Sequence, residues 1–117
     1  MRRSILVFVS GKYSGDIEDN IAFAKTFAEN LWDNGYTAIC PHLNTAKFNE
    51  EGKTKWHDYL AGDIVILERC DALLALPNWK ESDGSQVEIE KAYGLDIPVF
   101  ESVEMMNLYF GLENEQD

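Results

Sequence analysis

Residues 71–92 read DALLALPNWKESDGSQVEIEKA: an apolar run, a short polar turn, and a segment with helical periodicity. Residues 71–76 are typical of a buried strand, and residues 83–95 are predicted to form a helix. The turn between them is rich in serine and glycine. A strand, such a turn and a helix together expose backbone N–H groups at the helix N-terminus. This arrangement predicts a site for an anion.

Predicted strands and helices alternate along the rest of the chain. Asp16 or Asp19 can cap a helix that ends at Gly35. The other elements are strands at residues 5–9, 36–40 and 97–100 and helices at residues 54–69 and 102–112, with a long loop at residues 43–53. This alternation indicates right-handed β-α-β units. We predict an α/β fold, a small doubly wound parallel sheet of four or five strands in flavodoxin-like order, which binds ligands at the carboxyl ends of its strands.

The chain of 117 residues is predicted to be a single domain over residues 1–112, followed by an acidic tail over residues 113–117. Lys and Arg number 10 against 21 Asp and Glu, which gives a formal net charge of −11. Because a nucleic-acid backbone is bound by clustered basic side chains, we expect no nucleic-acid polymer as a partner. A free nucleotide is compatible with this charge, since a small anion needs only a few local donors.

Cysteine content and hydropathy indicate the compartment. Cys40 and Cys70 are too few for a disulfide framework and are expected to be reduced, buried thiols. The apolar run at residues 5–9 is too short for the core of a signal peptide. No run approaches the roughly 20 apolar residues of a membrane helix. We therefore expect a cytoplasmic protein with no membrane partner.

Two carboxylates are candidate catalytic groups. Glu88 is expected about one turn inside its helix, facing the serine-glycine turn, although acidic residues early in a helix also favour the helix dipole. Asp63 lies between Leu60 and Leu67 on an apolar stripe, where a carboxylate is costly unless it is paired or faces a cavity. Desolvation there would raise its pKa, which suits a general acid. The alternative is that Asp63 lies at the edge of the stripe, in solvent.

Other residues give weaker signals. Trp79 follows the third strand and either stacks on a base or covers the core. His42 and His57 lack the spacing of metal ligands, and we expect neither a metal site nor a cofactor. Residues 11–15 match neither a P-loop nor a dinucleotide fingerprint. These patterns favour neither ATP hydrolysis nor NAD binding.

Five segments occur in one order along nearly the whole chain, up to about Phe100. They are Phe8-Val9-Ser10-Gly11, Cys40-Pro41-His42, Trp56-x-x-Tyr59-Leu60-x-x-Asp63-Ile64, Arg69-Cys70-Asp71-Ala72 and Ser82-x-Gly84-x-x-x-Glu88-x-x-x-Ala92. Together they resemble the nucleoside 2-deoxyribosyltransferase-like family, in particular its small bacterial and phage members. That family includes 2′-deoxynucleoside 5′-phosphate N-hydrolases. The resemblance implies a flavodoxin-like fold that cleaves or transfers the N-glycosidic bond of a 2′-deoxynucleoside or its 5′-monophosphate.

The resemblance also implies roles for single residues. Glu88 matches the nucleophile that forms a covalent deoxyribosyl-Glu intermediate, and Asp63 matches the acid. Ser82 matches the serine that contacts phosphate in the monophosphate-specific branch. A homodimer or higher homo-oligomer is implied as well. Phe8 departs from the pattern, because active members have a tyrosine there whose hydroxyl helps to position the nucleophile; Tyr13 is another possible source of a hydroxyl.

We expect a small-molecule deoxynucleoside or deoxynucleotide as the partner, and Asp63 partly buried in the same cavity as Glu88. The expected substrate-binding residues are Phe8, Ser10, Gly11, Tyr13, His42, Trp79, Ser82, Gly84 and Ser85. The helix N-terminus, with Lys12 or Lys80 adding charge, predicts that a 5′-monophosphate binds better than the free nucleoside. Two alternatives stay open: a non-catalytic nucleotide-binding or sensing module with the same fold, and an acidic interaction protein.

Overall fold

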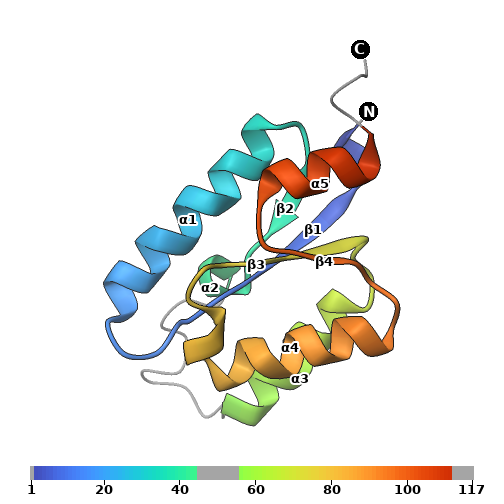
Figure 1. The fold of residues 1–117 in the computed structure, drawn as a ribbon. Coiled ribbons are helices and arrows are strands. Elements are labelled where there is room, and N and C mark those ends of the chain that lie inside the picture. Colours follow the sequence, from blue (N-terminus) through green and yellow to red (C-terminus); the bar gives the residue numbers. More distant parts are fainter. Residues whose placement is uncertain (1, 45–55, 112–117) are drawn as a thin grey trace.

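The computed structural model describes residues 2–44 and 56–111, which form an α/β fold around one parallel sheet (Figure 1). The strands are β1 (Leu6–Ser10), β2 (Thr37–Ile39), β3 (Ala72–Ala75) and β4 (Val99–Phe100), in the spatial order β2-β1-β3-β4. The helices are α1 (Ile17–Asp33), α2 (Pro41–Asn44), α3 (Trp56–Leu67), α4 (Asp83–Gly94) and α5 (Val103–Phe110), with short 3-10 turns η1 (Arg2–Ser4) and η3 (Trp79–Glu81). The predicted flavodoxin-like fold is confirmed, with four strands in the described ranges.

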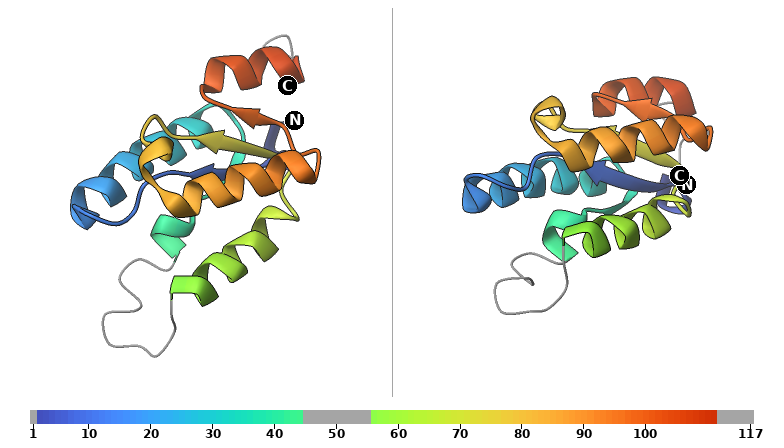
Figure 2. Two further views of the ribbon diagram at one scale, coloured as in Figure 1. Left: turned by 60° about the horizontal axis from the view of Figure 1, so that its bottom comes forward. Right: turned by 90° about the horizontal axis from the view of Figure 1, so that it is seen from below.

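Helices cover both faces of the sheet. Figures 1 and 2 show α1 and α5 on one face and α3 and α4 on the other. Successive side chains of a strand point to opposite faces, so Val7 and Val9 enter the core under α1 and α5, whereas Phe8 enters the core under α3 and α4. By the same period, Ser10 lies on the side of α3 and α4. This alternation brings the last residue of β1 towards α4.

Capping residues fix where the long helices begin. The Asp16 side chain accepts a hydrogen bond from the Asp19 N–H at the start of α1, which settles the choice between the two predicted caps. The predicted face of α1 is buried at Ala24, Ala28 and Leu31. After α1 the chain turns through Gly35, whose φ of 89° favours glycine.

The structure differs from the sequence-based expectations mainly at the ends of the strands. β1 is shifted by one residue from the predicted 5–9 at the same length, and the other three strands are each two residues shorter than predicted. Most of the predicted 43–53 loop and the whole 113–117 tail lie outside the described residues. Cys40 and Cys70 are buried thiols, as expected. Within residues 2–44 and 56–111, no helix combines the length and apolarity needed to cross a membrane.

Candidate active site

A cavity of about 400 Å³ opens where β1 and β3 end. In a doubly wound sheet the helices that follow two neighbouring strands run to opposite faces, which leaves a crevice at this edge. The chain leaves β1 towards α1 and leaves β3 towards α4, so the crevice forms between these two connections. The lining residues are Val9, Gly11, Tyr13, Ser14, Ile17, Pro41, Tyr59, Leu60, Asp63, Glu81, Ser82, Asp83, Gly84, Ser85 and Glu88.

The loop after β1 packs tightly against the end of β3. A Cβ atom at Gly11 would lie 2.5 Å from Leu76 Cδ1, so glycine allows this close approach. The Leu76 N–H donates to the Ser10 carbonyl (2.8 Å), and the Lys12 N–H donates to Asn78 Oδ1 (3.0 Å). These contacts hold the two connections together beside the cavity, which Gly11 lines.

The N-terminus of α4 forms one wall. Ser82 is its N-cap, and Ser82 Oγ accepts a hydrogen bond from the Ser85 N–H at 3.1 Å. The Ser85 side chain is 1% exposed, and its hydroxyl has no hydrogen-bond partner among the described residues. A buried hydroxyl without a partner costs free energy, so a bound molecule that reached Ser85 Oγ would gain a hydrogen bond there. Backbone N–H groups and this hydroxyl together favour an electron-rich ligand atom at this wall.

Glu88 lies one turn further along α4 and is 7% exposed. The Ser10 hydroxyl donates a hydrogen bond of 2.6 Å to Glu88 Oε1. Burial raises the pKa of Glu88 to about 8; the Ser10 hydrogen bond opposes this rise, and the nearby charge of Asp63 adds to it. Glu88 is therefore a buried carboxyl group that ionises near neutral pH.

Asp63 reaches the same cavity from α3. It is half-buried, and burial raises the pKa of its carboxyl to about 6. Leu60 and Leu67 belong to the same apolar stripe of α3 as Asp63. Leu60 lines the cavity, and Leu67 is buried in the core. Of the two positions that the sequence allowed for Asp63, the structure shows the one that faces a cavity. Two carboxyl groups with raised pKa values, from different helices, meet in one space.

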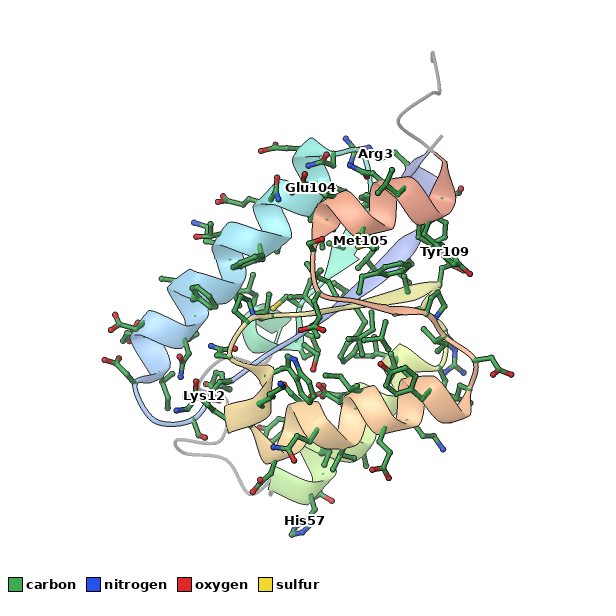
Figure 3. All side chains as sticks on the ribbon, viewed as in Figure 1. Arg3, Lys12, His57, Glu104, Met105 and Tyr109 are labelled. Carbon is green, nitrogen blue, oxygen red and sulfur yellow. The ribbon has the colours of Figure 1, made fainter. Side chains whose placement is uncertain are left out.

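The rim of the cavity is acidic. Glu81 and Asp83 line it and are exposed. Lys12 Nζ forms an ion pair with Glu81 (3.2 Å), and Figure 3 shows Lys12 at the end of β1. Lys80 Nζ lies 5.7 Å from the centre of the Trp79 ring. Both lysines were expected to add positive charge at the cavity. The charge of Lys12 is partly neutralised by Glu81, and the charge of Lys80 lies over the Trp79 ring.

The structure gathers some predicted substrate-binding residues and separates others. Gly11, Tyr13, Ser82, Gly84 and Ser85 line the cavity with Glu88 and Asp63.

Four predicted contacts lie elsewhere or are undescribed. Phe8 is fully buried in the core under α3 and α4, and Trp79 packs against that same core, so Trp79 takes its core-covering alternative. Ser10 is buried behind Glu88 and contacts the carboxylate. The side chain of His42 lies outside the description, and Figure 3 shows His57 pointing outward from α3.

Tyr59 was not predicted as a site residue, although it lines the cavity. It lies four residues before Asp63 on α3, so the two side chains share a helix face. The sequence could have indicated Tyr59 as a site residue through its i, i+4 spacing from Asp63. The contact between Ser10 and Glu88 had a weaker signal, since it depends on how α4 lies over β1.

Solved structures with the same fold were found by comparison. A 2-deoxyribosyltransferase from Bacillus psychrosaccharolyticus matches with a TM-score of 0.58 and 18% identity over 80% of this chain and 69% of that one. A conserved protein from Enterococcus faecalis V583 matches with a TM-score of 0.68 and 18% identity over 81% of this chain and 60% of that one. A 2-desoxiribosyltransferase from Leishmania mexicana matches with a TM-score of 0.61 and 14% identity, covering 81% of this chain and 61% of that one. No curated protein matches the sequence.

These likenesses define the class: a small α/β protein with the fold of the 2-deoxyribosyltransferases, as the sequence resemblance predicted. The chain spans about 60–69% of the length of the three structures. Residues 5–102 match the family described as a domain of unknown function (DUF7768), and the chain belongs to that family.

Proposed function

We propose that the protein cleaves or transfers the N-glycosidic bond of a 2′-deoxynucleoside or its 5′-monophosphate. The observation that carries the proposal is the meeting of Glu88 and Asp63 in one cavity, each with a pKa raised by burial. Perturbed carboxyl groups that share a cleft are frequent in catalytic sites. A cavity of about 400 Å³ is large enough for a small-molecule ligand. The fold shared with two 2-deoxyribosyltransferases supports the same reaction class.

The proposed chemistry is a double displacement. Glu88, ionised, attacks C1′ of the deoxyribose, and the C1′–N bond breaks with its electron pair passing to the base. Asp63, protonated, gives its proton to the departing base nitrogen. Water or a second base then attacks C1′ and loses its proton to the Asp63 carboxylate, and the C1′–O bond to Glu88 breaks to regenerate the free carboxylate. A 2′-deoxy sugar suits this path, because it lacks the electron-withdrawing 2′-hydroxyl that disfavours positive charge at C1′.

The two pKa values are in the opposite order to these roles. With about 8 for Glu88 and about 6 for Asp63, the singly protonated pair carries its proton mostly on Glu88. The productive form, with Glu88 ionised and Asp63 protonated, is then the less populated of the two singly protonated forms. In the proposed reaction, any contact that favours the Glu88 carboxylate increases the population of this form.

The proposal is tested by incubating the protein with a panel of 2′-deoxynucleosides and their 5′-monophosphates and measuring free base by chromatography. We expect base release from at least one compound and none from the matching ribonucleoside. The same panel in a thermal unfolding assay separates the alternatives. Ligand-dependent stabilisation without base release would contradict catalysis and indicate a sensing module, and neither effect would indicate an interaction protein.

A further inference from the structure

We infer that Ser10 is a positioning residue for Glu88: its buried hydroxyl orients the carboxylate by holding Oε1 and favours its ionised form. The inference rests on the proposed function for its kinetic consequences. Its structural basis is the hydrogen bond of 2.6 Å between Ser10 Oγ and Glu88 Oε1, formed across 78 positions of sequence. The bond joins the last residue of β1 to the second turn of α4.

The surroundings of Ser10 indicate a contact with the protein rather than with substrate. The side chain is 1% exposed, and Ser10 is absent from the residues that line the cavity. Its hydroxyl donates to Glu88, and its backbone carbonyl accepts from the Leu76 N–H (2.8 Å). The hydroxyl therefore approaches Glu88 from the core side of the cavity wall, on a rigid strand, which is where a positioning group acts best.

The bond has two consequences for the carboxylate. It engages Oε1, so Oε2 is the oxygen left to attack C1′. It also stabilises the negative charge, because a hydroxyl donates more strongly to a carboxylate than to a carboxylic acid. Phe8, which lies two residues earlier on the same side of β1, has no hydroxyl. In this chain the hydroxyl that contacts Glu88 is thus supplied from the end of the strand.

The titratable groups that line the cavity with Glu88 are Tyr13, Tyr59, Asp63, Glu81 and Asp83. Asp63 raises the pKa of Glu88, after burial, and the Ser10 hydrogen bond lowers it. Loss of a hydrogen bond to a charged group corresponds to a rise of about 1 to 2 in the pKa of Glu88. Ser10→Ala is therefore expected to shift the ionisation of Glu88 to higher pH.

The first experiment measures that pKa without any substrate. The carboxyl ¹³C signal of Glu88, assigned by its loss in Glu88→Gln, is titrated by NMR in the wild type, Ser10→Ala and Ser85→Ala. Ser85 is the matched control, because it is also a buried serine of the same wall but makes no hydrogen bond to Glu88. We expect the Glu88 pKa to rise in Ser10→Ala and to stay at its wild-type value in Ser85→Ala. An unchanged pKa in Ser10→Ala overturns the inference.

The second experiment measures base release as a function of pH. Because the productive form becomes rarer, kcat of Ser10→Ala at pH 7 is expected to fall roughly 10- to 150-fold, with KM nearly unchanged since Ser10 does not reach the cavity. Above both pKa values only the protonation of Asp63 limits the rate, so the two proteins converge near pH 10. A deficit that is constant across pH, in a variant with native circular dichroism, would show a purely structural role and contradict the inference.

The two experiments also separate this inference from the proposed function. If the wild type releases no base from any compound, the proposed function fails and the NMR titration alone decides whether Ser10 holds the carboxylate. If the wild type is active and the Glu88 pKa is the same in Ser10→Ala, the inference fails and the proposed function stands.

Discussion

At the scale of single residues, Glu88 and Asp63 set the pH range in which the cavity can work. Below about pH 6 both carboxyl groups are protonated and the proposed nucleophile is absent; above about pH 8 both are ionised and the proposed acid is absent. We therefore predict a bell-shaped dependence of kcat/KM on pH, with limbs near 6 and 8 and a maximum near 7. Base release measured from pH 4 to 10 checks it. A rate that keeps rising above pH 9 would contradict the requirement for a protonated Asp63.

The residues of the site differ in how far the sequence could predict them. Glu88 and Asp63 were found because a carboxylate behind a serine-glycine turn and a carboxylate on an apolar stripe are each unusual. Ser10 was predicted to contact substrate, but it contacts Glu88, because the height of α4 over β1 is set by tertiary packing. The role of Trp79 could not be decided from the sequence, because a tryptophan after a strand can either stack on a ligand or cover the core.

At the scale of elements, the N-terminus of α4 determines whether a phosphate group is favoured. The exposed rim carboxylates Glu81 and Asp83 repel an anion, but water and salt screen them. A hydrogen bond from the Ser82 hydroxyl to a phosphate would be worth about 1.5–3 kcal/mol. We therefore predict that a 5′-monophosphate binds better than the free nucleoside.

Ser82→Ala tests this prediction. Monophosphate binding, measured by calorimetry, is expected to weaken roughly 10- to 150-fold, while nucleoside binding barely changes. Ser102→Ala is the matched control: Ser102 caps α5 through a hydrogen bond from the Met105 N–H at 3.1 Å, as Ser82 caps α4, but it lies outside the cavity lining. Both variants should lose about 1 kcal/mol of stability. Equal affinity for the two ligand forms, unaffected by Ser82→Ala, would mean that Ser82 is only a cap.

Element types were predictable because local signals agreed. The apolar runs of β1 and β3 are short and continuous, as expected for strands buried on both faces. Asp16, Ser82 and Ser102 each cap a helix through the side chain. The ends of β2 and β4 were less predictable, because these strands lie at the two edges of the sheet and pair on one side only. Pairing partners, which sequence does not give, decide how long an edge strand is.

At the scale of the whole molecule, assembly stays a prediction. The family resemblance implies a homodimer or higher homo-oligomer that completes the site. On α5, Met105, Leu108 and Tyr109 are largely exposed, and Figure 3 labels Met105 and Tyr109 on this helix. We expect light scattering to give at least twice the mass of one chain at micromolar concentration. A single-chain mass together with full base release would contradict a site that needs a second subunit.

The central claim is that Glu88 is the nucleophile of an N-glycosidic reaction. The most direct measurement is the rate of base release by Glu88→Gln, compared with Glu90→Gln, which changes an exposed carboxylate two residues further along α4. Glutamine resembles the protonated side chain that the cavity already accommodates, so both variants should fold. We predict that Glu88→Gln loses roughly 10³-fold or more in kcat, whereas Glu90→Gln keeps wild-type activity. Base release by Glu88→Gln at a rate close to that of Glu90→Gln would contradict the account.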